Sequence, residues 1–421
     1  MVNKKYTLLF SLFLILGILF TACAPKATPE TPTEVEKPSE PTKEEAAPEE
    51  EELVFGLLMV GPYNDKGWSQ AHYDAGLYVE QNVPGARMLY IDKVNVADRP
   101  GTTPAQIAEE LISKGAKVII FNSDDMKDSC HEFAAAHPEI VVIHASGDGA
   151  WKEGIDYKEL PNLSNVMGRM EYGKMTAGCA AALSTKTGKI AYLGPLINDE
   201  TRRLASSAYL GAKYCWENYA GKNPADLVFE INWIGFWFNI PGVTADPTQV
   251  ADNFFSQDFD VVISGIDTTE ALVEAKKISA EGKEVYAIPY DYKGACAEAE
   301  DVCLGVPYFN WGPSYAKILK DVQAGTYAPT WDFVGPYWED INDPDKSAIG
   351  FVKGNALADD KATQLDAFIG ELTNGLNLWV GPLNLQDGTP LLAEGEIATD
   401  YQVWYLPQLL EGMLGLSSPA E

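Results

Sequence analysis

Several residues that could hold a small polar ligand follow directly after short apolar runs. Asn64, Asp65 and Trp68 come after the first run, and Ser123 and Asp124 come after a later one. An indole offers a face on which a flat ring can stack, while amides and carboxylates bind hydroxyl or amino groups. The same residue types also cap helices after strands, so each residue taken singly supports either interpretation.

A second group of loops has the same composition and is richer in aromatic residues. Phe236 and Trp237 lie in one loop, Gly265 and Asp267 in the next, and Asp291 in a third. A set of loops that all combine rings, amides and carboxylates favours a ligand site over helix capping in every loop. We therefore predict that the side chains in these two groups of loops are ligand contacts.

Motifs for catalysis, cofactor binding and metal binding are not found. The sequence contains no Gly-x-Ser-x-Gly motif and no Gly-x-x-x-x-Gly-Lys-Ser/Thr phosphate loop, and none of its four histidines is paired at i,i+4. His131 and His137 are expected on one helix at solvated positions rather than as metal ligands. The sequence therefore predicts a protein without catalytic residues, cofactor or metal.

The ligand loops alternate with the strands and helices that must position them. Continuous apolar runs predict buried strands at residues 53–60, 118–121, 141–144, 190–193, 261–264 and 285–288. Helical spacing of apolar residues predicts helices at 69–81, 104–114, 128–137, 172–183, 204–219, 247–257 and 269–280. Strands that alternate with helices of this length form parallel sheets, so the fold class is α/β.

The length of the chain suggests two lobes. Cores rarely grow beyond about 250–300 residues, and this chain has 421. We expect a first lobe at 53–165, a second lobe at 166–290, and hinge crossings with shared C-terminal segments at 291–421. Ligands of open α/β sheets bind outside the carboxyl ends of the strands, so loops from both lobes would line one cleft.

The first 52 residues differ in character from the rest. Lys4 and Lys5 precede a 14-residue apolar run, residues 7–20, which is too short for a membrane span and matches a secretory signal peptide at 1–22. Small residues before Cys23 resemble a lipobox, in which this cysteine carries lipid. Residues 24–52 contain six prolines and ten glutamates, which predicts a disordered tether running from the anchor at 23 to 52. The body would therefore be anchored to the membrane outside the cytoplasm.

The charge of the chain argues against nucleic acid as a partner. The formal net charge is −30, from 61 acidic and 31 basic residues, and there is no basic block. The signal contributes +2 and the tether −7, so −25 falls on residues 53–421.

Five cysteines remain after the anchor residue, so they cannot all pair within the chain. Cys296 and Cys303 flank a short acidic turn, and a local disulfide between them fits an extracytoplasmic protein. Cys179 lies among small residues of a predicted helix, where we expect a buried free thiol.

Several segments resemble the basic membrane protein (PnrA-like) family of ABC transporter substrate-binding lipoproteins. Residues 64–70, Asn-Asp-Lys-Gly-Trp-Ser-Gln, are similar to the family loop N-D-K-S-F-N-Q. Further similar segments are residues 168–181, residues 185–190 with Arg202-Arg203, residues 379–383 with Asp387-Gly388, and residues 406–415. The similarity extends over nearly all of residues 53–421.

The resemblance implies a two-lobed, type I periplasmic-binding-protein-like fold that closes around a small polar ring compound. The expected ligand is a purine nucleoside, delivered to an ABC permease. Trp68 would stack on the base, with Asn64 and Asp65 beside it, and a second ring would come from the 236–238 segment. Gly265 and Asp267 would approach the sugar, and the Asp291 carboxylate would accept its hydroxyls.

The sequence departs from the family pattern in the segment 308–311, which lacks the usual lysine, so the ribose interpretation is weakened. A base, another flat heterocycle or a different sugar stays open as the ligand. Two other functions also stay open: a ligand-sensing lipoprotein without transport, and an extracytoplasmic nucleoside or sugar hydrolase that uses Asp124, Asp125 or Asp291.

Overall fold

The computed structural model describes residues 52–419. The predicted signal peptide, the predicted lipid attachment at Cys23 and the predicted tether up to residue 51 lie outside the described residues. Within residues 52–419, no helix is long and apolar enough to cross a membrane.

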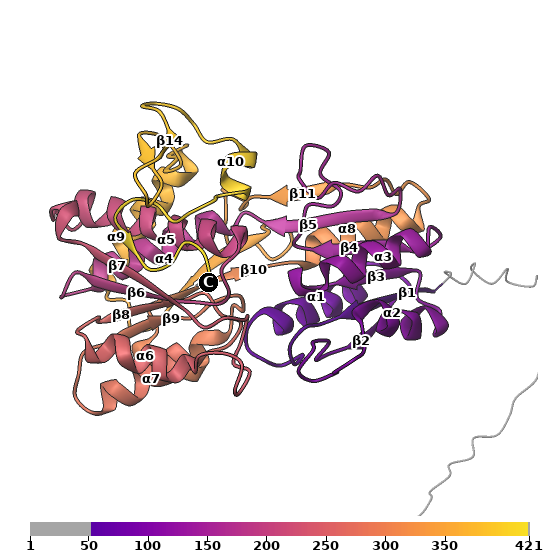
Figure 1. The fold of residues 1–421 in the computed structure, drawn as a ribbon, viewed down its shortest axis with the longest axis horizontal. Coiled ribbons are helices and arrows are strands. Elements are labelled where there is room, and N and C mark those ends of the chain that lie inside the picture. The colour runs from indigo at the N-terminus through magenta and orange to yellow at the C-terminus, as the bar shows by residue number, and fades with distance from the viewer. Residues whose placement is uncertain (1–51, 420–421) are drawn as a thin grey trace, which may run out of the picture. The chain divides into compact units, whose positions relative to one another are not determined.

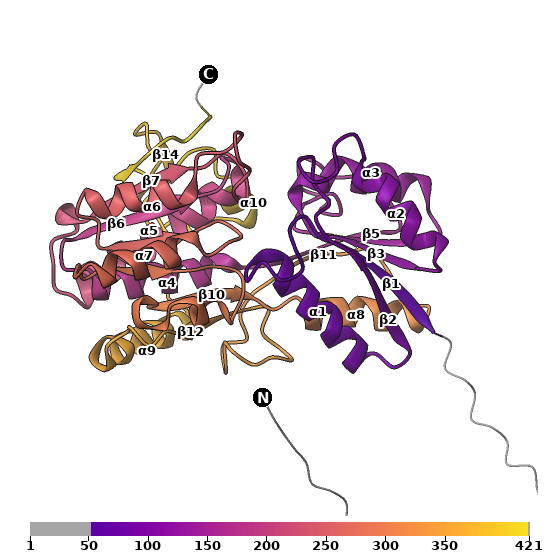
Figure 2. The same ribbon diagram turned by 90° about the horizontal axis from the view of Figure 1, so that it is seen from below.

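The first lobe is built on a six-stranded sheet in which every pair of neighbouring strands is parallel (Figures 1 and 2). Its strands are β1 (Leu53–Leu58), β2 (Ala86–Ile91), β3 (Val118–Phe121), β4 (Val141–Ala145), β5 (Leu163–Gly168) and β11 (Trp331–Val334). Its helices are α1 (Trp68–Asn82), α2 (Pro104–Ser113), α3 (Lys127–Ala136) and α8 (Gly312–Gln323). Helices α2 and α3 cover one face of the sheet and α1 and α8 the other, as Figure 2 shows.

The second lobe is built on a five-stranded parallel sheet. Its strands are β6 (Lys189–Gly194), β7 (Val228–Trp233), β8 (Val261–Ser264), β9 (Tyr286–Ile288) and β15 (Met413–Leu414). Its helices are α4 (Met170–Ser184), α5 (Asp199–Asn218), α6 (Pro247–Ser256) and α7 (Glu270–Ala280). Helices α4 and α5 cover one face and α6 and α7 the other (Figure 1).

Shorter elements complete the second lobe and the crossings between the lobes. The antiparallel pairs are β10 (Gly305–Phe309) with β12 (Ile349–Lys353), and β13 (Leu383–Asn384) with β14 (Pro390–Leu392). The remaining helices are α9 (Asp359–Thr373), α10 (Asp400–Trp404) and the 3₁₀ turns η1 (Asp124–Met126), η2 (Pro224–Asp226), η3 (Ala295–Glu298) and η4 (Glu300–Val302).

The chain passes between the two lobes three times: from β5 to α4, from β10 to α8, and from β11 to β12. The expected boundary at residue 165 falls inside β5, whose last residue, Gly168, still pairs with β11. The segment after residue 291 supplies α8 and β11 to the first lobe and returns to the second lobe at β12.

All six strands and all seven helices expected from apolar patterning are present, to within a few residues at their ends except at the N-terminus of α5, which begins at Asp199 rather than residue 204. The strands are well predicted because strands buried on both faces are continuously apolar.

Strands β2, β5 and β7 were not expected, since each mixes polar with apolar residues. Residues 163–168 of β5, for example, are buried throughout although they include Ser164 and Asn165. The side chain of Ser164 shares a hydrogen bond with the Tyr327 hydroxyl, and the Asn165 amide donates to the Ser146 carbonyl, which explains how these polar groups are accommodated.

Strand order places two switch points where ligands bind in such sheets. The first sheet runs β2-β1-β3-β4-β5-β11, so the connections leaving β1 and β3 diverge to opposite faces. The second sheet runs β9-β8-β6-β7-β15, with the same divergence after β6 and β8. At such a point a crevice forms outside the carboxyl ends of the strands.

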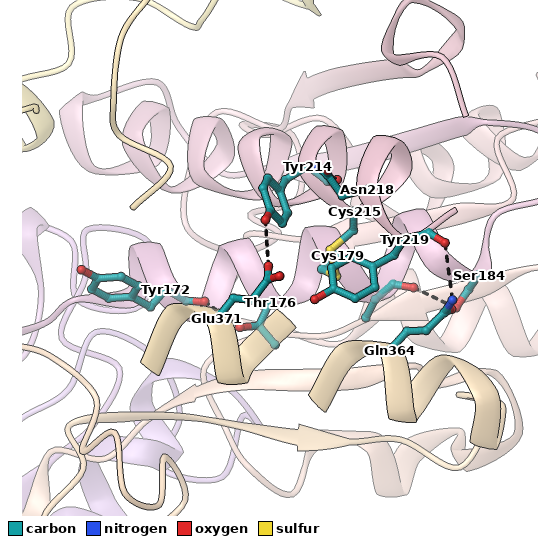
Figure 3. The surroundings of a disulfide bond; sticks show 11 residues. Tyr172, Thr176, Cys179, Ser184, Tyr214, Cys215, Asn218, Tyr219, Gln364 and Glu371 are labelled. Carbon is teal, nitrogen blue, oxygen red and sulfur yellow. Dashed lines mark hydrogen bonds between the residues drawn. A yellow bond between two sulfur atoms is a disulfide. The ribbon is translucent and has the colours of Figure 1, made fainter. Parts of the chain in front are cut away.

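A disulfide joins α4 to α5 in the second lobe, between Cys179 and Cys215 (Figure 3). The expectation of a free thiol at Cys179 was therefore wrong, because its partner lies 36 positions away on the facing helix and sequence spacing does not reveal that pairing. The helices approach closely because Gly178 has no side chain: a Cβ there would lie 1.9 Å from the Ala208 carbonyl oxygen. The predicted Cys296–Cys303 disulfide is present, and Cys130 is a buried free thiol.

Helix α9 lies against the same helix pair. The Tyr214 hydroxyl of α5 donates to Glu371 at 2.8 Å, and the Gln364 amide donates to the Tyr219 carbonyl at 3.4 Å (Figure 3). The disulfide therefore links α4 to α5, and the two hydrogen bonds link α9 to the same helix pair.

The prediction for the histidines of α3 was wrong at one position. His131 is buried and packs edge-on against His144, with 6.2 Å between ring centroids, whereas only His137 at the helix end reaches carboxylates, those of Glu109 and Glu139. Burial lowers the pKa of His131 to about 4, so it is neutral at pH 7.

Candidate functional site

A cavity lies at the switch points of the two sheets and is walled by both lobes. Its walls consist of Trp68, Ser123, Asp124, Ser146, Tyr192, Glu200, Thr201, Leu204, Trp237, Gly265, Asp267 and Tyr290. The first four come from loops and the start of α1 in the first lobe, and the others come from the second lobe. Six of the predicted ligand contacts are therefore brought together: Trp68, Ser123, Asp124, Trp237, Gly265 and Asp267.

Trp68, the first residue of α1, is held in place on the side of the first lobe. Its indole N–H donates to the Asn122 carbonyl at the end of β3, and its ring meets Phe309 and Trp311 edge-on at 5.3 and 5.2 Å. Asp65 fixes the start of the helix by accepting the backbone N–H groups of Gly67, Ser69 and Gln70. These contacts preset the indole orientation before any ligand arrives.

The neighbouring wall of the first lobe is polar. The Ser123 side chain caps the short turn η1 by accepting the Asp125 N–H, and the Asp124 carboxylate accepts the Asn198 amide of the second lobe at 3.4 Å. Asp124 therefore lines the cavity and also forms a hydrogen bond with the second lobe.

The aromatic loop after β7 supplies the facing wall. Trp237 is almost fully buried, and its indole N–H has no hydrogen-bond partner among the described residues. Its carbonyl accepts the Asp267 N–H at 2.9 Å, which ties this loop to the loop after β8. A buried donor without a partner costs free energy, so a ligand acceptor placed here would recover it.

One buried lysine lies beneath the carboxylates of the second lobe. Lys174 of α4 donates to the Ser264 carbonyl at 2.7 Å, and its ammonium lies 3.2 Å from the centroid of the Tyr290 ring. Burial lowers the pKa of Lys174 to about 7, although the nearby Asp291 charge acts in the opposite direction.

Carboxylates outnumber cations at the site, and burial dominates their protonation. Burial raises the pKa of Glu200 to about 7 and that of Asp65 to about 6. Burial and the charges of neighbouring carboxylates raise the pKa of Asp267 well above its ordinary value. The pKa of Asp291 is also raised well above its ordinary value by burial, with Lys174 opposing the shift. Carboxyl groups that are kept protonated in this way can donate as well as accept hydrogen bonds, so such a site suits neutral polar groups.

Four of the predicted contacts do not line the cavity. Asn64 is exposed, the Asp65 carboxylate accepts backbone N–H groups at the start of α1, and Phe236 packs against the core of the first lobe. Asp291 is fully buried behind the wall, and neither of its carboxylate oxygens has a hydrogen-bond partner among the described residues.

Several cavity residues were missed in the sequence, namely Ser146, Tyr192, Glu200, Thr201, Leu204 and Tyr290, together with Lys174 behind them. Glu200 and Leu204 lie on one face of α5, four residues apart, and Tyr192 points inward from β6. A lysine inside a helix that is otherwise buried was the one signal that could have identified Lys174, since buried lysines need a partner.

The cavity has a free volume of only about 20 Å³ in this conformation. Aromatic and carboxylate side chains thus nearly fill it in this conformation. Ligand entry therefore requires movement of these side chains or of the lobes that carry them. Within residues 52–419, no group of three or more His, Cys, Asp or Glu side chains could hold a metal ion.

Two curated proteins are similar to this chain over most of its length. A purine-binding protein of Brucella abortus is 26% identical over 358 residues, which cover 84% of this chain and 91% of that protein. A putative ABC transporter glucose-binding protein of Haloferax volcanii is 23% identical over 287 residues, which cover 68% of this chain and 65% of that protein.

Solved structures agree with the predicted fold class. A solute-binding protein of an ABC transporter from Aeropyrum pernix superposes with a TM-score of 0.59 at 12% identity, over 79% of this chain and 93% of that chain. At this identity the likeness shows the fold alone, and it confirms the type I periplasmic-binding-protein-like architecture. The family model of PnrA-like ABC transporter substrate-binding proteins matches residues 53–332. The chain therefore belongs to the PnrA-like family of ABC transporter substrate-binding proteins.

Proposed function

We propose that this protein binds a purine nucleoside, or a closely related ring compound, in the cavity between its lobes. The lobes close around the ligand, and the closed form is presented to an ABC permease. Binding energy then serves to shift an open–closed equilibrium, as in other hinged receptors.

The observation that carries the proposal is that two tryptophans from different lobes, Trp68 and Trp237, line one cavity. Two such faces suit a flat ring stacked between them, and a ring held by both lobes would favour the closed form. Neither lobe alone supplies both faces.

The polar groups of the cavity support a ligand rich in hydrogen-bond donors and acceptors. The Trp237 indole N–H and the Tyr290 hydroxyl are buried and have no partner among the described residues. Ring nitrogens or a carbonyl of a purine can accept from such donors, while Ser123, Asp124 and Asp267 can accept from amino or hydroxyl groups. The purine-binding relative supports the same ligand class.

The other predicted contacts take supporting roles in this proposal. Asp65 positions Trp68 through the start of α1, and Asn64 lies at the rim of the same loop. Phe236 packs on the first lobe beside Trp237, and Gly265 lets the second-lobe loop approach Tyr192, because a Cβ there would lie 2.6 Å from that ring.

The proposed location follows from the N-terminal sequence. Lipid on Cys23 and an acidic tether to residue 52 would hold the binding body at the outer side of the cytoplasmic membrane, within reach of the permease. Binding would occur without chemical change of the ligand, since no catalytic motif accompanies the carboxylates.

The test uses adenosine, guanosine and inosine with the purified full chain. Tryptophan fluorescence should fall and the melting temperature should rise with at least one of them, because a ring between Trp68 and Trp237 changes their surroundings and binding stabilises the folded state. Chromatography should recover the nucleoside unchanged. The absence of any fluorescence change and any thermal shift with all three nucleosides would contradict the proposal, and release of free base would replace it with a hydrolase.

A further inference from the structure

The three crossings between the lobes meet at one buried ring, that of Phe309. This residue ends β10, where the chain leaves the second lobe for α8, and it is 3% exposed. Its partner in the antiparallel pair is Ile349, the first residue of β12, where the chain returns to the second lobe. At the third crossing, a Cβ on Gly168 would lie 3.0 Å from the Phe309 ring and 2.5 Å from the Ile349 side chain. Residues of all three crossings therefore lie against Phe309.

The same ring contacts one wall of the cavity from each lobe. It meets Trp68 of the first lobe edge-on, with 5.3 Å between ring centroids, and it packs against Tyr290 of the second lobe at 6.0 Å. Trp68 and Tyr290 line the cavity, whereas Phe309 does not. Any effect of Phe309 on a bound ligand must therefore pass through these neighbouring rings.

The Phe309 ring is held in place by stacking and by its backbone. Trp311 stacks on it with 4.6 Å between centroids, and His72 of α1 stacks on Trp311 at 4.4 Å. The Phe309 backbone N–H donates to the Asp291 carbonyl at 3.0 Å. Close-packed interiors deform little, so displacement of one of these neighbours must move the others.

We propose that Phe309 is a positioning residue that couples the two walls of the cavity to closure of the lobes. Rotation of one lobe against the other moves the crossings and with them the Phe309 ring, which changes the spacing of Trp68 and Tyr290. A ligand that fits between the walls of the closed form therefore favours the closed position of the crossings. This inference rests on the proposed function, and it gives a role to the segment 308–311, in which the sequence departs from the family pattern.

The test measures binding kinetics of Phe309→Leu by stopped-flow tryptophan fluorescence. It uses the full chain and whichever of adenosine, guanosine and inosine binds the wild type most tightly. Phe309→Met is the second variant, because the flexible methionine fills more of the space and also lacks the ring. Phe351→Leu is the matched control: Phe351 is also 3% exposed and lies on the partner strand β12, but it packs in the core of the second lobe and does not line the cavity.

Both Phe309 variants should release the nucleoside at least tenfold faster than wild type, because their closed form is less stable. Their association rates should change less than threefold, since the encounter takes place with the open form. Phe351→Leu should keep both rates within threefold of wild type although it loses a ring of equal burial. Unchanged release from the two Phe309 variants, or an equal increase in Phe351→Leu, would overturn the coupling role.

A double variant tests whether Phe309 acts through Trp68. In a Trp68→Ala background, Phe309→Leu should change the calorimetric affinity less than threefold, because one of the rings that Phe309 links is already missing. A further tenfold loss in that background would overturn the inference. A wild type that binds none of the three nucleosides would contradict the proposed function and this inference together, whereas normal wild-type binding with unchanged Phe309 variants would contradict this inference alone.

Discussion

At the scale of single residues, the site depends on the imbalance between its carboxylates and its one buried lysine. Lys174 is fully buried and donates only to the Ser264 carbonyl, while burial shifts the pKa values of Glu200, Asp267 and Asp291 upward. Protonated carboxyls can donate as well as accept hydrogen bonds, so the site can adapt to both kinds of ligand group.

Trp68 should carry much of the ligand affinity. The Trp68→Ala variant should bind the cognate nucleoside at least tenfold more weakly, about 1.4 kcal/mol, because one stacking face is lost. Calorimetric titration below the melting temperature of both proteins measures the effect. Trp338→Ala is the control, since Trp338 packs on Tyr172 and does not line the cavity. Equal affinity of Trp68→Ala and wild type would place the ligand elsewhere.

Glu200 should make stability depend on pH in a defined direction. Its pKa is raised from an ordinary 4.5 to about 7, so the unfolded chain loses this proton before the folded one does as the pH rises. The stabilisation from this group is complete below about pH 4.5 and is lost as the pH passes through 7. Glu200→Gln should therefore melt a few degrees higher than wild type at pH 8 and show a smaller difference at pH 5. An identical difference at both pH values in thermal melts would contradict the raised pKa.

At the scale of elements, the sequence predicts the strands that have a continuous apolar pattern. It misses a strand whose buried polar residues form hydrogen bonds with distant parts of the chain. The apolar runs of β1, β3 and β8 are unmistakable because both faces of these strands are buried. Strand β5 was not predicted because its buried polar residues form hydrogen bonds with distant segments, as Ser164 does with the Tyr327 hydroxyl.

The residues that line the cavity show the same difference between what local sequence patterns reveal and what tertiary packing determines. Trp68 and Asp267, which were predicted from loops that follow strands, line the cavity because the carboxyl ends of parallel strands converge. Glu200 also lines the cavity but was not predicted, because it projects from helix α5, where a charged residue ordinarily faces solvent. This face of α5 becomes part of the cavity wall only because it lies opposite loops of the first lobe.

The disulfide between α4 and α5 should stabilise the second lobe without contributing to affinity. Replacing Cys179 and Cys215 with alanine should lower the free energy of unfolding by about 2–4 kcal/mol, because the closed loop restricts the unfolded chain. Urea titration measures this. Replacing Cys296 and Cys303, which close a loop of only 7 positions, should cost less. A larger loss from the second pair than from the first would contradict this account.

At the scale of the whole binding body, two lobes meet through a few close contacts around the cavity. A Cβ on Gly67 would lie 1.7 Å from the Asp267 carbonyl oxygen of the other lobe, and Lys66 forms an ion pair with Glu298. The loop before α1 therefore fits against the second lobe only because residue 67 has no side chain.

Gly67→Ala should hinder closure and weaken the nucleoside at least tenfold. The melting temperature of the free protein is measured alongside, so that a loss of affinity can be separated from a loss of stability. Gly370→Ala is the matched control, because nothing lies within 4 Å of a Cβ at that position. Calorimetry gives the affinities, and a Gly67→Ala variant that binds as tightly as wild type would show that this contact plays no part in closure.

The most direct test of the central claim is native mass spectrometry of the full chain purified without denaturation. The account predicts a single adduct with the mass of a purine nucleoside, displaced by added adenosine and missing from Trp68→Ala. An adduct that lacks a heterocyclic ring, such as a free sugar or an amino acid, would contradict it, as would a protein that carries no adduct and gains none when adenosine is added.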